Sequence, residues 1–385
     1  MKFNFDQIID RHNTNSVKWE YFPPDVLPFW VADTDFAVDP AIIQSIQKRL
    51  EHPIFGYSVD DPELINAIVQ RMHNFYGWEI GAESVILVPG IVSGFNFAIR
   101  AVCKPGENII FQTPAYPPFF HAPQNNQVGS VLNPMRFNPE SDLYEIDFAD
   151  FESKITPETK MFLLCNPQNP TGRVLSKTEL ERLGNICLER NLVICSDEIH
   201  SDIVYSGNHH IPIASLSPDL AQQSITFIAP SKTFNIPGLS CSAAIIQNEA
   251  LRKDFRRALA GFSSGVSCLA QAAGLAAYTQ GAEWHRQLSA YLEDNRNYLL
   301  DFVHREMPAI KTTEIQATFL SWMDCSGLQL PLSPQKFFEE KAKVGLNDGA
   351  AFGEEYENFV RLNFGTSRAT LTEALEKMAE AINRS

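Results

Sequence analysis

The sequence predicts an α/β protein with a large domain on a mainly parallel β-sheet and a smaller α+β domain. Two observations support this fold class. Short apolar runs alternate with helical patterns from about residue 39 to residue 246, which indicates strands buried on both faces with helical crossovers. After residue 282 the pattern changes to one long helical segment followed by alternating extended and helical stretches. We expect an N-terminal segment (1–45) joined to the small domain, a large domain (46–282) and a small C-terminal domain (283–385).

Two helix starts open the large domain. Asp39-Pro40 and Asp61-Pro62 each place an N-cap residue before a proline in the first helical turn. The second helix has helical apolar spacing and ends at Gly77. A third predicted helix spans 176–190, where Ser176 and Glu179 have the spacing of a capping box.

Extended segments are predicted wherever short apolar runs occur. In the large domain these are 85–88, 108–111, 161–165, 192–195, 225–229 and 243–246. In the small domain we expect a long helix over 283–306, a helix near 333–343, a capped helix from Thr370, and extended segments over 318–323 and 359–364.

Composition and charge exclude several classes of protein. The 385 residues include 31 Lys and Arg against 46 Asp and Glu, a net charge of −15, and no basic run, so nucleic acid is not expected as a partner. The uncharged stretch 258–282 contains serines, glutamines and glycines, which favours a buried helix of small residues over a membrane span.

The cysteine content and the N-terminal sequence predict a cytoplasmic protein. The seven cysteines are dispersed and form no Cys-x-x-Cys pair, which is typical of reduced, mostly buried thiols. The first twelve residues lack the apolar core of a signal peptide. Neither a metal site nor a nucleotide site is expected: His209 and His210 are adjacent, which is poor ligand geometry, and no dinucleotide or triphosphate motif occurs.

Polar motifs follow four of the predicted strands, at the sheet edge where ligands bind in open α/β folds. They are Pro-Gly90-Ile-Val-Ser-Gly, Asn-Pro-Gln-Asn169-Pro-Thr-Gly, Ser-Asp197-Glu-Ile-His200 and Pro-Ser231-Lys232-Thr-Phe-Asn. Singly, each has an ordinary explanation as a turn, a loop, a helix cap or a surface lysine. Together they resemble the fold type I pyridoxal phosphate enzymes, over nearly the whole chain. That resemblance implies the aspartate aminotransferase-like transferase fold with a seven-stranded sheet and pyridoxal 5'-phosphate as cofactor.

The resemblance also implies roles for these residues. Lys232 is the lysine that binds the cofactor aldehyde, and a primary amine is the group that can do this and then take the Cα proton. Asp197 pairs with the pyridine nitrogen and keeps the ring able to accept electrons. Asn169 lies near the phenolic oxygen and the substrate. The phosphate is expected at the helix that begins near Gly90, Ile91 and Val92, with the Ser231 hydroxyl.

Two further residues are expected near the cofactor ring. Tyr116 matches the family's aromatic residue that stacks on the cofactor, with an ordinary core tyrosine as the alternative. His200, three residues after Asp197, is a second candidate near the cofactor.

Other segments resemble the MalY/PatB cystathionine β-lyase group: Asp10-Arg11, 30–36, Phe-Gly-Tyr57-Ser and the stretch after Lys232. Thr34 and Glu20 depart from that pattern, where methionine and aspartate are expected. Ser240 stands eight residues after Lys232, where typical aminotransferases carry an arginine that binds the phosphate. This difference favours the lyase branch.

Two residues are expected to complete the site. Tyr57 matches the tyrosine that reaches the cofactor phosphate of the neighbouring subunit, which implies a homodimer; the alternative is an aromatic packed in its own chain. Arg368 matches the arginine that binds the substrate α-carboxylate, with a surface salt bridge as the alternative.

The predicted function is that of a carbon–sulfur β-lyase that cleaves cystathionine, cysteine or related amino acids to a thiol, pyruvate and ammonia. An aminotransferase is the alternative enzyme. A binding or regulatory protein without turnover is the alternative of another class, and the intact Lys232, Asp197 and Asn169 argue against it.

Overall fold

The structure is a computed structural model that describes residues 2–384. Its largest sheet has seven strands in the order β2-β10-β9-β8-β7-β3-β4. Only β10 runs antiparallel to its neighbours, so the predicted fold class is confirmed. The strands are β2 (Val85–Val88), β3 (Asn108–Thr113), β4 (Gly129–Pro134), β7 (Thr159–Cys165), β8 (Val193–Asp197), β9 (Ser224–Ile228) and β10 (Ser242–Ile245).

All six predicted strands of this sheet are present. The seventh, β4, was not predicted from its apolar pattern, because it lies at the sheet edge and most of its residues are not buried. Central strands such as β7 and β9 are buried almost throughout, which explains their continuous apolar runs.

Alternate residues of each strand face opposite sides of the sheet and meet different helices. On one side Phe111, Leu163 and Phe227 pack with helices α4 (Ile91–Val102), α5 (Pro118–Asn125) and α9 (Glu249–Leu259). On the other side Phe162 and Ile194 pack with α6 (Phe148–Ser153), α7 (Lys177–Glu189) and α8 (Pro218–Gln222). The strands β2 and β10 complete that second side with α3 (Pro62–Tyr76) and α10 (Cys268–Gln280).

The predicted helix starts are confirmed by their caps. Asp39 caps α2 (Pro40–Leu50) by accepting from the backbone N–H of Ala41, and Asp61 caps α3 by accepting from that of Glu63. The helix α3 ends at Gly77, which has a φ of 59°. Ser176 and Glu179 form the expected capping box of α7.

The uncharged stretch 258–282 does not form the single helix that the sequence suggested. The helix α9 ends at Leu259, and a separate helix, α10, begins at Cys268. Gly261 and Gly265 between them have φ angles of 80° and 81°, which interrupt a right-handed helix. Among residues 2–384, no helix is both long and apolar enough to cross a membrane.

The smaller sheet has the order β11-β12-β15-β14 and is antiparallel. Its strands are β11 (Lys311–Thr312), β12 (Leu320–Asp324), β14 (Asn347–Asp348) and β15 (Phe359–Asn363). Helices α11 (Ala282–Glu306), α12 (Pro334–Phe337) and α13 (Arg368–Asn383) accompany it. The helix α13 begins two residues before the predicted Thr370, because Ser367 is its cap.

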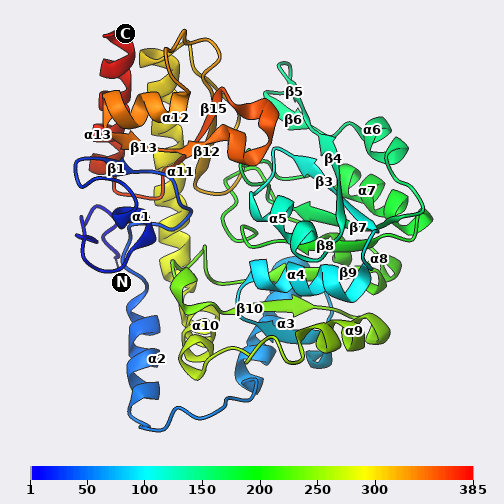
Figure 1. The fold of residues 1–385 in the computed structure, drawn as a ribbon. Helices are drawn as coiled ribbons and strands as arrows, with labels where there is room; N and C mark the ends of the chain where they lie inside the picture. Colours follow the sequence, from blue (N-terminus) through cyan, green and yellow to red (C-terminus); the bar gives the residue numbers. More distant parts are fainter. Residues whose placement is uncertain (1, 385) are drawn as a thin grey trace.

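The N-terminal segment contacts elements of the C-terminal part. Strand β1 (Leu27–Pro28) pairs in parallel with β13 (Val344–Gly345), and α1 (Val17–Glu20) precedes it. Figure 1 shows this segment beside α11 and α13, away from the seven-stranded sheet. A hairpin of β5 (Arg136–Asn138) and β6 (Leu143–Glu145) completes the strands. The division of the chain at residues 45 and 282 stays a prediction.

Candidate active site

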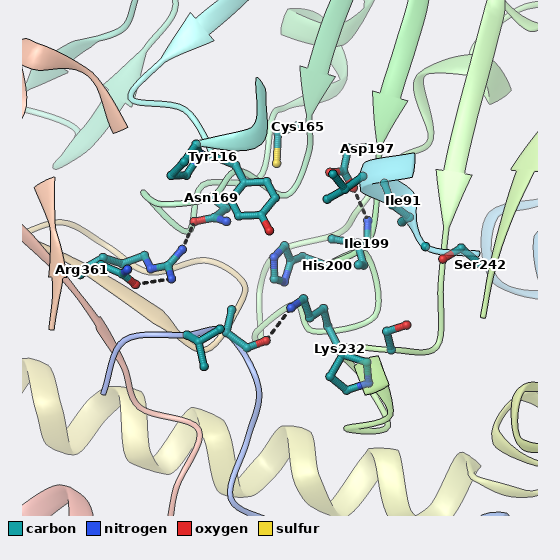
Figure 2. A pocket seen from close by; sticks show the side chains of 18 of the residues that line it. Ile91, Tyr116, Cys165, Asn169, Asp197, Ile199, His200, Lys232, Ser242 and Arg361 are labelled. Carbon is teal, nitrogen blue, oxygen red and sulfur yellow. Dashed lines mark hydrogen bonds between the residues drawn. The ribbon is translucent and has the colours of Figure 1, made fainter. Parts of the chain in front are cut away.

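A pocket of about 320 Å³ lies beyond the carboxyl ends of the parallel strands. Its wall includes nine of the residues that the sequence analysis selected: Gly90, Ile91, Val92, Tyr116, Asn169, Asp197, His200, Ser231 and Lys232. They lie at the ends of β2, β3, β7, β8 and β9 or in the segments that follow these strands, so the sheet brings together motifs that are far apart in the sequence. Figure 2 shows Asp197 and Ser242 opposite Arg361, with His200 and Lys232 between them.

Lys232 projects from the tight turn that follows β9. The turn is held by backbone hydrogen bonds from Phe234 to Pro230 and from Ile236 to Ser231. The amine of Lys232 donates to the carbonyl oxygen of Ala32 over 2.6 Å. Burial, and then the charge of Arg361, lower the pKa of Lys232 to about 8, so much of this amine is uncharged in mildly alkaline solution.

Asp197 is the last residue of β8 and is buried. Its carboxylate accepts a hydrogen bond of 3.2 Å from the backbone N–H of Ile199. Burial raises the pKa of the Asp197 carboxyl to about 7, against the effects of this hydrogen bond and of the Lys232 charge. A cationic partner in the pocket would favour its ionised form.

His200 is buried beside Lys232, and within residues 2–384 its Nδ1 has no hydrogen-bond partner. Burial, and then the positive charges of Lys232 and Arg361, lower the pKa of His200 to about 3. The imidazole is therefore neutral in ordinary buffers, and it offers a hydrogen-bonding atom to whatever occupies the pocket.

One end of the pocket is suited to an anion. Gly90 has a φ of 93° and precedes α4, whose first backbone N–H groups face this end. The hydroxyls of Ser231, Ser240 and Ser242 line the same pocket. The Ser242 side chain is buried, and its Oγ has no partner within the described part of the chain. An unpartnered buried hydroxyl beside a helix N-terminus fits a phosphate oxygen.

The opposite end holds Arg361, which the sequence analysis missed. Arg361 lies on β15 and donates from Nη1 to Asn169 Oδ1 over 2.8 Å and from Nη2 to the Trp30 carbonyl oxygen over 2.8 Å. Its Nη2 also donates to Asn347 Oδ1 over 2.5 Å, while its Nε has no partner in residues 2–384. Burial lowers the pKa of Arg361 to about 10, so it remains a cation at neutral pH.

The structure corrects the expected position of Arg368, which does not line the pocket. As the first residue of α13, it donates from Nε to Asn295 Oδ1 over 2.8 Å and stacks over Tyr298. The strand β15 brings Arg361 to the pocket instead, because its side chain lies on the opposite face from the core residues Val360 and Leu362.

Tyr57 is the other selected residue outside the pocket of its own chain. It is fully exposed, in the segment between α2 and α3 that has no helix or strand. Figure 1 shows this segment at the lower edge of the molecule. The alternative of an aromatic packed within its own chain is therefore wrong.

Comparison with known proteins identifies the family. The family model for aminotransferase class I and II matches residues 24–378. The chain belongs to this family. Within it, the chain is 39% identical to cystathionine beta-lyase PatB of Bacillus subtilis, covering 99% of this chain and all of that protein. It is 35% identical to protein MalY of Escherichia coli, covering 99% of each. These two relatives place the chain in the MalY/PatB group of fold type I enzymes.

A solved structure extends the comparison to the cofactor. The crystal structure of cystalysin from Treponema denticola, described as containing pyridoxal 5'-phosphate, has a TM-score of 0.96 and 31% identity, and both chains are fully covered. The pocket of this aminotransferase-family chain fits the same cofactor. It has a lysine for the aldehyde, a buried carboxylate for the ring nitrogen, and side-chain atoms of Ser242 and His200 that have no partner within residues 2–384.

Proposed function

We propose that the protein is a pyridoxal phosphate-dependent carbon–sulfur β-lyase that acts on cystathionine, cysteine or related S-substituted cysteines. The observation that carries this proposal is the convergence of Lys232, Asp197 and Arg361 on one buried pocket. The full-length similarity to a protein named cystathionine beta-lyase supports the choice of reaction. With cysteine and water, the reaction yields hydrogen sulfide, pyruvate and ammonia, which balances all atoms.

Arg361 binds the substrate α-carboxylate in this proposal. A buried guanidinium offers two parallel donors to a carboxylate, which fixes both the position and the orientation of Cα. The existing hydrogen bonds to Asn169 and Asn347 hold the guanidinium plane in place. A substrate carboxylate would accept from Nη2 in place of the Trp30 carbonyl and from Nε, which has no partner within the described residues.

Lys232 has two tasks. Its amine first holds the cofactor, and after the substrate amine replaces it, the free amine removes the Cα proton. Bound pyridoxal phosphate supplies the aldehyde that captures the substrate amine and the ring that accepts the electron pair from Cα. The lowered pKa of Lys232 suits both tasks, because the uncharged amine is the nucleophile and the base.

Other pocket residues hold the cofactor in this proposal. Asp197 would keep the ring nitrogen protonated, and Tyr116 would stack on the ring. Asn169 and the neutral His200 lie near its phenolic edge. Gly90, Ile91 and Val92 would hold the phosphate with the Ser231 hydroxyl, because the first N–H groups of α4 and the hydroxyls of the pocket favour an anion.

An aminotransferase is the second candidate, because the family includes that activity and shares the removal of the Cα proton. Ser240 distinguishes the two weakly: it stands where typical aminotransferases carry a phosphate-binding arginine, and it has a φ of 53° in the turn after Lys232.

The deciding experiment omits any keto-acid acceptor. Purified enzyme is incubated with cystathionine or cysteine, and pyruvate and thiol are measured against enzyme concentration. A lyase forms many equivalents of pyruvate per active site. A transaminase stops after one half-reaction and resumes only when a keto acid is added, and that outcome would overturn the proposal.

We also propose that the protein works as a homodimer in which Tyr57 reaches the cofactor phosphate of the partner. The segment between α2 and α3 exposes Ile54, Phe55, Tyr57 and Val59, and Phe262 is exposed as well. An exposed group of large apolar side chains is typical of an interface. The partners in this proposal are a small amino-acid substrate and the second subunit. Neither nucleic acid nor a membrane is proposed as a partner.

A cytosolic location is part of the proposal. All seven cysteines are free thiols, and five of them are buried. Free thiols in this number are typical of a reducing compartment.

A further inference from the structure

A buried carboxylate lies directly behind the pocket. Glu198 follows Asp197 in the sequence, and its side chain lies on the opposite side of the backbone, together with that of Ser196. Its carboxylate accepts from Ser196 Oγ over 2.9 Å and from His210 Nε2 over 2.8 Å. The side chains of His210 and Glu198 are only 1% and 2% exposed, so this is an interior pair.

The hydrogen bonds assign the proton of His210. Asn166 Oδ1 accepts from the backbone N–H of Leu175 over 3.0 Å, which directs the amide nitrogen of Asn166 toward His210 Nδ1, 3.4 Å away. An amide nitrogen can only donate, so Nδ1 is an acceptor and the ring proton is on Nε2. His210 is therefore a neutral donor, and Glu198 carries the negative charge.

This charge has no cationic partner. Among residues 2–384, no Lys or Arg forms an ion pair with Glu198. Burial of a charge that is met only by neutral donors is costly, and a nearby positive charge would reduce the cost. The same charge acts on Asp197, where it adds to burial in raising the pKa of that carboxyl. The two adjacent carboxylates therefore favour a cation at the pocket end of β8.

The same network fixes the position of site residues. The backbone N–H of Asn166 donates to the carbonyl oxygen of Asp197 over 3.1 Å, while the Asn166 side chain contacts His210. Asn166 also begins the loop that carries Asn169, which in turn accepts from Arg361. His210 and Glu198 thus connect the ends of β7 and β8, the two strands whose ends face the expected cofactor ring.

We propose that Glu198, held by His210, is a positioning residue that stabilises the proton on the cofactor's ring nitrogen through Asp197. Glu198 supplies a second buried negative charge behind Asp197. The hydrogen bonds of His210 and Asn166 hold Asp197 and Asn169 in position. The proposal rests on the cofactor assignment. It does not depend on the choice between lyase and aminotransferase, since both reactions use a protonated ring.

The test compares Glu198→Gln with wild type and with Asp150→Asn. Glu198→Gln removes the charge and keeps the shape. Asp150 is a matched control, since it is a hydrogen-bonded carboxylate on α6, outside the pocket. Holoenzyme is prepared with pyridoxal phosphate enriched in ¹⁵N at the ring nitrogen, and the nitrogen chemical shift is measured with the visible spectrum and with kcat and KM.

The expected result is a shift of the ¹⁵N signal toward the unprotonated value in Glu198→Gln only. The value of kcat should fall roughly tenfold, as expected for loss of one charge at several ångströms in a protein interior, with little change in KM. A signal and a kcat equal to those of Asp150→Asn would overturn the proposal, because a purely structural role changes stability and leaves the nitrogen protonated.

A second variant keeps the test decisive if Glu198→Gln does not fold. Ser196→Ala removes one hydrogen bond to the Glu198 carboxylate and no charge. It weakens the stabilisation of that charge and should move the ¹⁵N signal in the same direction by a smaller amount. An unchanged signal in folded Ser196→Ala counts against the proposal. Wild-type enzyme that binds no pyridoxal phosphate would instead contradict the cofactor assignment.

Discussion

The amine of Lys232 donates to the carbonyl oxygen of Ala32, 200 positions earlier in the chain. The residues around Ala32 are held by both parts of the structure. Asn235, in the turn after Lys232, bonds to Thr34 and Phe36, and Asn363 on β15 bonds to Val31 and Asp33. The N-terminal segment therefore forms a wall of the pocket and orients the amine whose reactivity the following predictions test.

Capture of the cofactor by Lys232 should depend on pH. Only the uncharged amine attacks the aldehyde, so the rate of covalent capture by apoprotein should rise about tenfold per pH unit and level off near pH 8. Stopped-flow absorbance measures the rate, and borohydride reduction with peptide mapping locates the adduct. An adduct on another lysine, or a rate independent of pH from 6 to 9, contradicts the assignment.

Arg361→Gln should move that profile to higher pH. The charge of Arg361 helps to lower the pKa of Lys232, so its removal should raise this pKa. The same stopped-flow experiment on the variant apoprotein gives the new midpoint. An unchanged midpoint would mean that burial alone sets the pKa of Lys232.

Arg361 and Arg368 should differ strongly in catalysis. Arg361→Gln removes two charge-assisted hydrogen bonds to the substrate carboxylate, each worth about 1.5 to 3 kcal/mol, so kcat/KM should fall at least about 100-fold. Arg368→Gln is the matched control and should stay within about threefold of wild type, because its guanidinium bonds to Asn295 outside the pocket. Equal losses of kcat/KM in both variants would indicate that Arg368 also binds the substrate carboxylate.

The apoprotein should lose stability as the pH rises from about 4 to about 7. Asp197 has a folded-state pKa of about 7, above its ordinary 3.8, so protonation of this carboxyl stabilises the folded state relative to the unfolded chain. That contribution is complete below the ordinary value and is lost as the pH rises through the folded-state value. Asp197→Asn should remove this decline and make the apoprotein more stable at pH 8, by on the order of 4 kcal/mol.

Urea unfolding of both apoproteins at pH 5, 6, 7 and 8 measures this difference. The holoenzyme of Asp197→Asn should nevertheless turn over far more slowly, because an amide cannot hold the ring nitrogen protonated. A variant with near-normal turnover would show that Asp197 does not contact the ring.

A mixed dimer tests the role of Tyr57. Tyr57→Phe alone should weaken cofactor retention by about one charge-assisted hydrogen bond, 1.5 to 3 kcal/mol. A dimer of one Tyr57→Phe subunit and one Lys232→Ala subunit should have one intact site and one site with both defects. Its active site should therefore bind the cofactor with wild-type affinity. An affinity like that of Tyr57→Phe would show that each tyrosine serves its own chain.

The sequence predicted most of the sheet and the site because both follow from local patterns. Continuous apolar runs predict strands buried on both faces, and the polar residues after them meet at one edge. The sequence analysis selected Arg368, which does not line the pocket, and missed Arg361, although a signal for Arg361 existed. In the extended pattern of 359–364, Val360 and Leu362 face the core, so Arg361 had to face the opposite side. Arg368 was chosen from its place in a motif and not from this alternation.

Other features left no trace that sequence patterns could reveal. The partner of Lys232 is a backbone carbonyl, which every residue possesses, so Ala32 has no chemical signature. The contact between Glu198 and His210 depends on the path of an irregular loop. The sequence analysis used His210 only to argue against a metal site, yet its side chain is buried and bonds to Glu198. Tertiary packing determines such contacts, and periodicity does not encode them.

The pocket is lined by residues from both ends of the chain, and this determines the stage of protein synthesis at which the pocket can form. Asn363 bonds to Val31 across 332 positions, and Arg361 bonds to Trp30 across 331. Contacts of such long sequence separation close late in folding, because their loops carry the largest entropy cost. A nascent chain that ends before β15 contains Lys232 and Asp197 but lacks the wall that joins Arg361 to the N-terminal segment. Cofactor capture is therefore expected to follow completion of the chain.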